Sequence, residues 1–208
     1  MTFRAPVRDL AFALSSVGHD ALIARAFPDL DSDTVAAVLE AAGGFAADVL
    51  APLNRGGDVA GARYENGKVS AAPGFAQAYQ AFVEGGWNSL SADPDHGGQG
   101  LSKAMELAVF EMVHSANMAF GLCPMLTQGA IEAIALHGTD RQKRLVLPKL
   151  VSGEWTGAMC LTEPQAGSDL SALTAMARPD GQGGWRLSGQ KIFITWGDHD
   201  AAENICHL

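Results

Sequence analysis

The residues best suited to chemistry lie in one short stretch, 159–169, in the C-terminal quarter of the chain. Pro164 breaks a short apolar strand there, because proline cannot donate to the hydrogen-bond ladder of a sheet. Gly167 and Ser168 follow in a small polar loop, where consecutive backbone N–H groups and a hydroxyl are suited to binding a pyrophosphate without a positive charge. A capped turn that starts a loop is an equally simple interpretation. The strand before the loop presents Met159, Leu161 and Thr162.

A second stretch with similar properties comes about two dozen residues later, at 191–197. It reads as another apolar strand that ends in a hydroxyl and an aromatic ring. Its distinctive residues are Phe193, Ile194 and Thr195. We interpret the two stretches as the two walls of one cofactor site, with a hydroxyl at each strand end to meet the edge of a heterocycle.

The elements before these stretches are predicted to be mostly helical. Residues 1–50 have helical periodicity, and Asp31 is among the N-cap candidates for a helix that runs to about Leu50 and ends near Pro52. Residues 54–58 are predicted to form a turn. Asn66 and Gly67 lie between two short β-prone pieces and predict a hairpin.

Helical periodicity returns from Pro73, and Phe75, Tyr79, Phe82 and Val83 share one face. A loop at 93–100 contains His96 between carboxylates; a metal or acid–base role is one interpretation, and a rigid turn that launches the next helix is the favoured one. Three more helices are predicted: from the cap Ser102 to Ala116, through Leu126 to His137, and over 141–150 with a strand-like exit at 147–150. The predicted core methionines are Met105, Met112, Met118 and Met125.

From residue 155 onward the pattern changes to strands. Residues 155–162, 172–178 and 185–195 are strand candidates separated by Gly, Pro and Asp turns. We therefore expect an α+β fold: an N-terminal all-α helical bundle domain, followed by the beginning of an antiparallel β-barrel or sandwich domain. The predicted boundaries are 1–155 and 156–208.

The composition narrows the class of protein. Hydrophobic residues make up 48% of the 208 residues and charged residues 18%, which is typical of a globular chain with an ample core. The net charge of −9 argues against nucleic acid as the main partner, since binding phosphates needs a basic face. The cysteines, Cys123, Cys160 and Cys206, are expected to be reduced, and their spacing does not suit a metal site. No segment is expected to reach the length of a membrane span, so we expect a soluble, cytoplasmic protein.

Four motifs from about residue 90 onward resemble the acyl-CoA dehydrogenase family. Residues 160–169 are similar to its flavin-binding signature, and residues 187–195 resemble its second flavin contact. Residues 142–154 resemble the segment that leads into its middle domain, and residues 97–101 resemble a loop of its helical domain. The resemblance implies an enzyme that uses FAD to oxidise an acyl-CoA to a trans-2-enoyl-CoA and passes the electrons to an electron-transfer flavoprotein.

The N-terminal part resembles one branch of that family. Residues 5–9, 52–58 and 82–87 are similar to the branch that contains 3-methylmercaptopropionyl-CoA dehydrogenase. The first 60 residues are expected to be an extension that belongs to this branch. The resemblance also implies a homodimer or homotetramer in the complete protein.

The resemblance assigns roles to particular residues. The pyrimidine side of the flavin would be lined by Met159, Leu161 and Thr162, and the other wall would be formed by Phe193, Ile194 and Thr195, with Thr195 near the redox nitrogen. The pyrophosphate would be held by Gly167 and Ser168, and Ser168 would also contact the pantetheine of the substrate. Three positions depart from the family pattern: Met159 stands where an aromatic is common, Gln165 where Gly is common, and Phe193 where Trp is common.

The catalytic base is not assigned within this chain. The resemblance places it on a Glu in a C-terminal helical domain, beyond Leu208, and Glu163 does not match that position. The chain is therefore expected to hold half of a flavin site and to be inactive alone. Two alternatives are an acyl-CoA oxidase, in which oxygen takes the electrons, and a non-catalytic flavin-binding or interaction relative.

Overall fold

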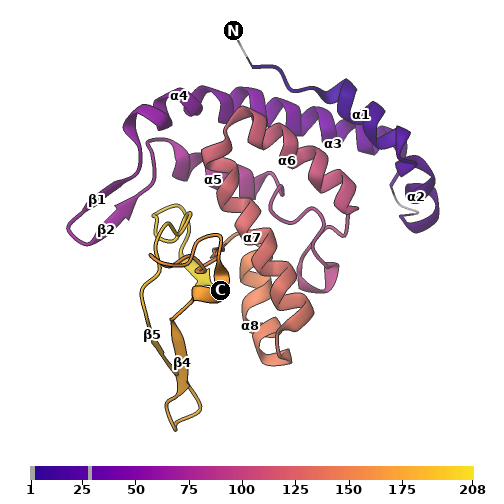
Figure 1. Ribbon diagram of the computed structural model, residues 1–208. Helices are drawn as coiled ribbons and strands as arrows, with labels where there is room; N and C mark the ends of the chain where they lie inside the picture. Colours follow the sequence, from indigo (N-terminus) through magenta and orange to yellow (C-terminus); the bar gives the residue numbers. More distant parts are fainter. Residues whose placement is uncertain (1–2, 28–29) are drawn as a thin grey trace.

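A computed structural model describes residues 3–27 and 30–208 and shows the expected α+β fold (Figure 1). Helices form one body, and the strands after residue 154 lie along one side of it. The helices are α1 (Val7–Ser16), α2 (His19–Ala26), α3 (Ser32–Phe45), α4 (Ala51–Ala60), α5 (Phe75–Glu84), α6 (Lys103–Ala116), α7 (Met118–His137) and α8 (Asp140–Val151), with shorter turns η1 (Ala46–Leu50), η2 (Pro94–His96) and η3 (Leu170–Ala172). The strands are β1 (Arg63–Glu65), β2 (Lys68–Ser70), β3 (Trp155–Ala158), β4 (Met176–Pro179), β5 (Trp185–Ser188) and β6 (Asn204–His207).

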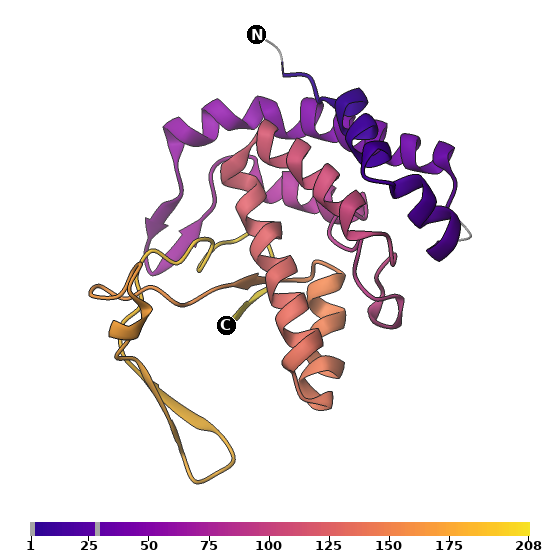
Figure 2. The same ribbon diagram turned by 45° about the vertical axis from the view of Figure 1, so that its right-hand side comes forward.

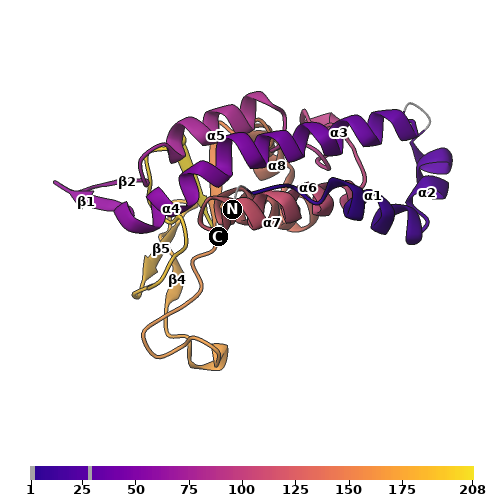
Figure 3. The same ribbon diagram turned by 90° about the horizontal axis from the view of Figure 1, so that it is seen from above.

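One helical rod, made of α3, η1 and α4, crosses the whole helical body (Figure 3). Asp31 caps its start by accepting a hydrogen bond from the Thr34 N–H at 2.7 Å, as predicted. The predicted end near Leu50 and the predicted turn at 54–58 were wrong. The wide turn η1, in which the Ala51 N–H bonds to the Ala46 carbonyl oxygen, precedes Pro52 and lets the helix continue through it.

Tertiary packing explains why the glycines of α4 do not end the helix. A Cβ atom on Gly57 would lie 2.7 Å from Cε1 of Phe75, so the ring of α5 needs a glycine at this position. Gly56, next to it, faces open space. Of the two glycines that suggested a turn, Gly57 is therefore the one that contacts α5.

The core lies between the rod and helices α5, α6 and α7. Helix α5 buries Phe75, Tyr79 and Phe82 along the predicted face. Two edge-to-face pairs, with ring centroids 6.1 and 5.9 Å apart, link Phe75 and Phe82 to Phe120 of α7. Of the four methionines predicted in the core, Met105 and Met112 are buried, whereas Met118 and Met125 are exposed.

Helix α8 contains a proline near its end. A capping box at Thr139 starts it, and the helix continues through Pro148 to Val151. The predicted strand-like exit at 147–150 was wrong, because Leu147 and Leu150, three residues apart on one helical face, are both buried against the neighbouring helices.

Two helical segments, Ser32–Ala60 and Met118–His137, are long and apolar enough to cross a membrane by length and composition alone. The expectation that no segment reaches this length was wrong. Both segments also place side chains in the core, among them Leu39 and Phe120, which are fully buried. A long apolar helix at the centre of a helical domain passes the same test.

The β region is smaller and less uniform than predicted. Strands β4 and β5 form the expected antiparallel hairpin, which projects away from the helices with every residue of both strands exposed (Figures 1 and 2). Strands β3 and β6, however, pair in parallel, and β3 packs on α7. All three predicted strands are only four residues long. The β1–β2 hairpin turns at Asn66 and Gly67, both with positive φ, as predicted.

Candidate functional site

The structure brings the two motif-bearing stretches side by side. The Ile192 N–H donates to the Thr162 carbonyl oxygen at 2.9 Å, and the Lys191 ammonium donates to the Leu161 carbonyl oxygen, also at 2.9 Å. Segments about thirty residues apart in sequence are thus joined by one backbone bond and one side-chain bond. The residues on either side of this junction are the ones predicted to contact a cofactor.

The first stretch extends the β3–β6 pairing. The Cys160 N–H donates to the Leu208 carbonyl oxygen at 2.7 Å, and the Leu208 N–H donates to the Ala158 carbonyl oxygen at 2.9 Å. Met159 and Leu161 are 45% and 37% exposed, and Thr162 is half-buried. The backbone of this wall is therefore fixed by the sheet, while its predicted contact side chains remain accessible.

The loop after Pro164 is tight and well anchored. Glu163 and Ala166 exchange two backbone hydrogen bonds, at 2.9 and 3.0 Å, and Ala166 is fully buried. Gly167 and Ser168 are exposed, and within residues 3–27 and 30–208 their backbone N–H groups donate no hydrogen bond. A Cβ on Gly167 would meet no atom within 4 Å. This loop has two free donors on an open face, which suits a phosphate group.

The second stretch points its side chains in different directions. Phe193 is 85% exposed and adopts φ +56°, a left-handed conformation that is uncommon for a non-glycine residue. Thr195 is exposed, whereas Ile194 is half-buried and lines a pocket on the side of the helical body. The three residues predicted to form one wall therefore serve two faces of this segment.

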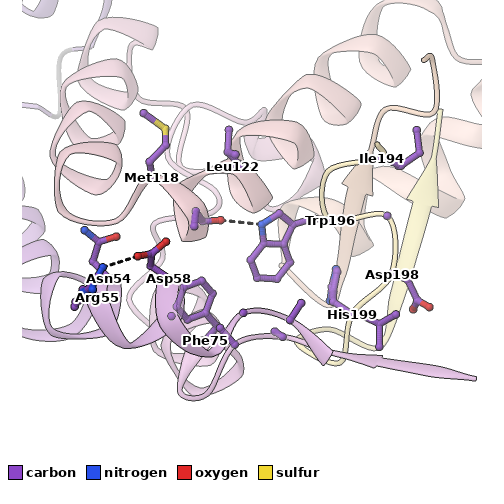
Figure 4. A pocket seen from close by; sticks show the side chains of 18 residues that line it. Asn54, Arg55, Asp58, Phe75, Met118, Leu122, Ile194, Trp196, Asp198 and His199 are labelled. Atoms are coloured by element: carbon purple, nitrogen blue, oxygen red, sulfur yellow. Dashed lines mark hydrogen bonds and ion pairs between the residues drawn. The ribbon is translucent and has the colours of Figure 1, made fainter. Parts of the chain in front are cut away.

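The pocket beside Ile194 has a volume of about 970 Å³ (Figure 4). The Trp196 ring stacks on Phe75 with centroids 6.2 Å apart, and its indole N–H donates to the Ala119 carbonyl oxygen at 2.9 Å. Much of the wall is apolar, and Arg55 pairs with Asp58 at one end. The lining comes from α4, β2, α5, α7 and the segment 194–199: Asn54, Arg55, Gly57, Asp58, Val69, Phe75, Met118, Leu122, Ile194, Trp196, Asp198 and His199 are among its residues.

His199 is a buried member of this pocket wall. Its Nδ1 accepts a hydrogen bond from the Ala201 N–H at 3.1 Å, so the proton of the neutral ring is on Nε2, which lies 3.0 Å from Oγ1 of Thr156. Burial lowers the pKa of His199 below the ordinary value of 6.5, against the opposing effect of the nearby carboxylates. The ring therefore joins the segment after Trp196 to β3 in its neutral form.

We expect the stability of the chain to fall as the pH drops below 6.5, partly because of His199. Since its folded pKa is depressed, the unfolded chain binds the proton more readily, and the contribution of His199 is complete above pH 6.5 and is lost below it. Urea unfolding midpoints measured across this range check the prediction. The His199→Gln variant should show a flatter pH dependence, and an unchanged slope would contradict the assignment.

Sequence reasoning noted the aromatic ring of Trp196 but not the pocket that it lines, and it missed His199 and the partners of Glu163. Glu163 is buried, and its carboxylate binds Lys191 at 2.8 Å and the Thr174 N–H at 2.8 Å. The only local signals were the positions of Glu163 before a proline and of Lys191 at the start of the second stretch. Neither position indicates a partner that lies 11 or 28 residues away.

A helical domain leads into a β region in which the two motif-bearing stretches lie side by side. The acyl-CoA dehydrogenase N-terminal domain model matches residues 32–154, and the chain belongs to this family. The predicted resemblance is thereby confirmed.

Individual relatives show which members of this family the chain resembles. The chain is 48% identical, over its whole length, to 3-methylmercaptopropionyl-CoA dehydrogenase of Ruegeria pomeroyi, of which it covers 36%. It is 37% identical to a butyryl-CoA dehydrogenase of Syntrophomonas wolfei over 77% of its own length and 27% of that protein. The solved butyryl-CoA dehydrogenase of Megasphaera elsdenii matches 84% of the chain and 43% of its own, with a TM-score of 0.66 and 26% identity. The chain thus spans about a third of the length of the curated relatives it matches.

Proposed function

We propose that this chain forms the helical domain and the start of the middle domain of an FAD-dependent acyl-CoA dehydrogenase. The observation that carries the proposal is the junction between Thr162 and Ile192, which sets the two flavin-type motifs next to each other. Membership of the family and the 48% identity to 3-methylmercaptopropionyl-CoA dehydrogenase support the same activity.

The exposed residues around the junction fit the group that this function needs. The free N–H groups of Gly167 and Ser168 would donate to the pyrophosphate, and the open space at Gly167 lets a ligand approach the backbone. The apolar side chains of Met159 and Phe193 would lie against the flavin ring system, which shields them from water. The remaining proposed contacts are Leu161, Thr162, Ile194 and Thr195, with Thr195 near the redox nitrogen.

The residues of this chain would bind and orient, and FAD when bound would accept the hydride taken from the acyl chain. Ser168 would also contact the pantetheine of the acyl-CoA thioester. Polarisation of the thioester carbonyl by hydrogen bonds would make the neighbouring proton acidic enough to remove. Electrons would leave for an electron-transfer flavoprotein, and the carboxylate that takes the proton would be supplied by a helical domain after Leu208.

A titration of the chain with FAD tests the proposed flavin contacts. We expect weak binding without co-purification of the yellow cofactor, because the proposed contact residues are open to solvent on one side. The Gly167→Ala variant should weaken the affinity about tenfold, equivalent to about 1.4 kcal/mol, because the added methyl stands where the ligand approaches. Flavin fluorescence and calorimetry measure both constants.

The matched control is Gly56→Ala, which adds a methyl in open space on α4, far along the chain from the loop. It should bind FAD as the unaltered chain does. Equal affinity of Gly167→Ala and the unaltered chain would remove the loop from the site, and the absence of any FAD binding would contradict the proposed function.

The reaction itself is tested on the polypeptide made from the complete reading frame. Reduction of an artificial electron acceptor that depends on an acyl-CoA is the expected result. Hydrogen peroxide formed in stoichiometric amount from oxygen would instead indicate an oxidase. A reading frame that stops at Leu208 would contradict catalysis by this chain.

A further inference from the structure

Glu163 is the buried centre of a partly exposed polar cluster beside the two motif-bearing stretches. Its side chain is 1% exposed, and its carboxylate accepts five hydrogen bonds. Lys191 and the Ala175 N–H donate to Oε1, at 2.8 and 3.0 Å. The donors to Oε2 are the Gln165 amide, the Thr174 N–H and the Thr174 hydroxyl, at 2.6, 2.8 and 2.9 Å.

Lys191 completes the connection from the other stretch. Its ammonium binds Oε1 of Glu163 and the Leu161 carbonyl oxygen, at 2.8 and 2.9 Å. The next residue, Ile192, makes the backbone bond to Thr162. Three adjacent bonds thus fix the separation of the two walls, and two of them belong to the Lys191 side chain.

The cluster also supports a strained part of the backbone. Phe193 and Trp196 both have positive φ, at +56° and +52°, although neither is a glycine. Such conformations persist only where the surroundings hold them in place. The ion pair between Lys191 and Glu163 holds the backbone immediately before this segment. The hydrogen bond from the Trp196 indole to the Ala119 carbonyl oxygen holds the end of the segment.

Proton transfer is not a role that this carboxylate can fill. The Lys191 ammonium, followed by the hydrogen bonds from Thr174 and Ala175, holds the pKa of Glu163 well below its usual range. The group stays ionised at neutral pH and offers no readily used lone pair to a substrate. Its geometry is that of a structural anchor.

We propose that Glu163 and Lys191 are positioning residues for the flavin site, which act by holding its two walls in register without touching the cofactor. This inference rests on the proposed function. It assigns the affinity of the site for FAD to a partly buried ion pair between the walls as well as to the residues on their surface.

The test compares Lys191→Met, which keeps the aliphatic stem and removes the charge, with Lys149→Met as a matched control. Lys149 pairs with Glu154 at the end of α8, and both side chains are exposed. We expect Lys191→Met to weaken FAD binding at least tenfold, Lys191→Arg to restore it to within about threefold, and Lys149→Met to leave it unchanged. Unchanged binding in Lys191→Met would overturn the inference.

Amide hydrogen exchange gives a second readout that needs no flavin. Lys191→Met should speed exchange at Ile192, Thr174 and Ala175 at least tenfold, and Lys149→Met should not. The unaltered chain could bind no FAD while these amides still lose protection in Lys191→Met. In that case the proposed function fails, but the bracing role, by which Glu163 and Lys191 hold the two walls in register, stands. If the amides keep their protection, the bracing role fails whatever the flavin does. The double variant E163Q/K191M, which removes both charges, keeps the test valid if the single variant does not fold.

Discussion

The Gly98→Ala variant should be destabilised by about 3 kcal/mol or more, the largest effect that we expect from adding one methyl group. A Cβ at Gly98 would lie 1.9 Å from the carbonyl oxygen of Ala92, which is a backbone atom and cannot move like the end of a flexible side chain. Urea unfolding followed by circular dichroism measures the loss.

The loop cannot easily move to relieve this clash, because backbone hydrogen bonds hold it at Gly98 and at Gly100. The Gly98 N–H donates to the Asp93 carbonyl oxygen, and the Gly100 N–H donates to the Ala92 carbonyl oxygen, both at 3.0 Å. The oxygen that the new methyl would displace is therefore the acceptor for Gly100. Ala92 itself is buried, so its backbone cannot turn outward without exposing apolar surface.

The control for this variant is Gly44→Ala on α3, where the added methyl meets no atom within 4 Å. Alanine is favoured over glycine in a helix by up to about 1 kcal/mol, so this variant should be neutral or stabilised. If Gly98→Ala unfolds at the same urea concentration as the unaltered chain, the close approach between the two loop segments would be refuted.

The features that could be predicted from sequence are those whose signals are local. Asp31 and Ser102 accept hydrogen bonds from the N–H groups of Thr34 and Met105, three residues on, as helix caps do. Asn66 with Gly67 specifies a hairpin by its backbone preferences alone. In each case the interacting residues lie within a few positions of one another, so a short stretch of sequence is enough to predict the structure.

Local signals failed where a distant residue decides the outcome. Pro52 with Gly57 looked like the end of a helix, but Phe75 packs on the glycine and keeps α4 helical. The parallel pairing of β3 with β6 depends on contacts between Trp155 and Asn204, nearly fifty residues apart. No periodicity within one segment contains that information.

The candidate site also has one part that could be predicted from local sequence and another part that depends on distant residues. Motif spacing indicated that the stretches around Thr162 and Thr195 belong together, and the structure joins them through Ile192. The pocket beside Trp196 could not be predicted, because its wall is assembled from three helices, a hairpin strand and the segment 194–199. His199, flanked by Asp198 and Asp200 in the sequence, gave no sign that it would be buried and neutral.

The Gly157→Ala variant should be destabilised by about 2–3 kcal/mol and should also weaken FAD binding. Gly157 lies in β3 directly on α7, where a Cβ would be 2.4 Å from the Cβ of Ala130 and 3.2 Å from the Leu126 carbonyl oxygen. The Gly157 N–H also donates to Oγ1 of Thr127 at 3.1 Å, a bond that lengthens if the strand is pushed away. Urea unfolding and FAD titration measure the two effects.

Removing the opposing methyl distinguishes a local clash from a general loss of packing. In the Gly157→Ala background, Ala130→Gly should recover part of the lost stability, although glycine costs α7 up to about 1 kcal/mol. Gly129→Ala, which adds a methyl to α7 in open space one residue away, should recover nothing through this contact. Since β3 continues into Met159 and Leu161, recovery of stability and of FAD affinity together would show that the position of β3 on α7 sets the position of the first wall. Strictly additive effects of Gly157→Ala and Ala130→Gly would contradict direct contact between the two residues.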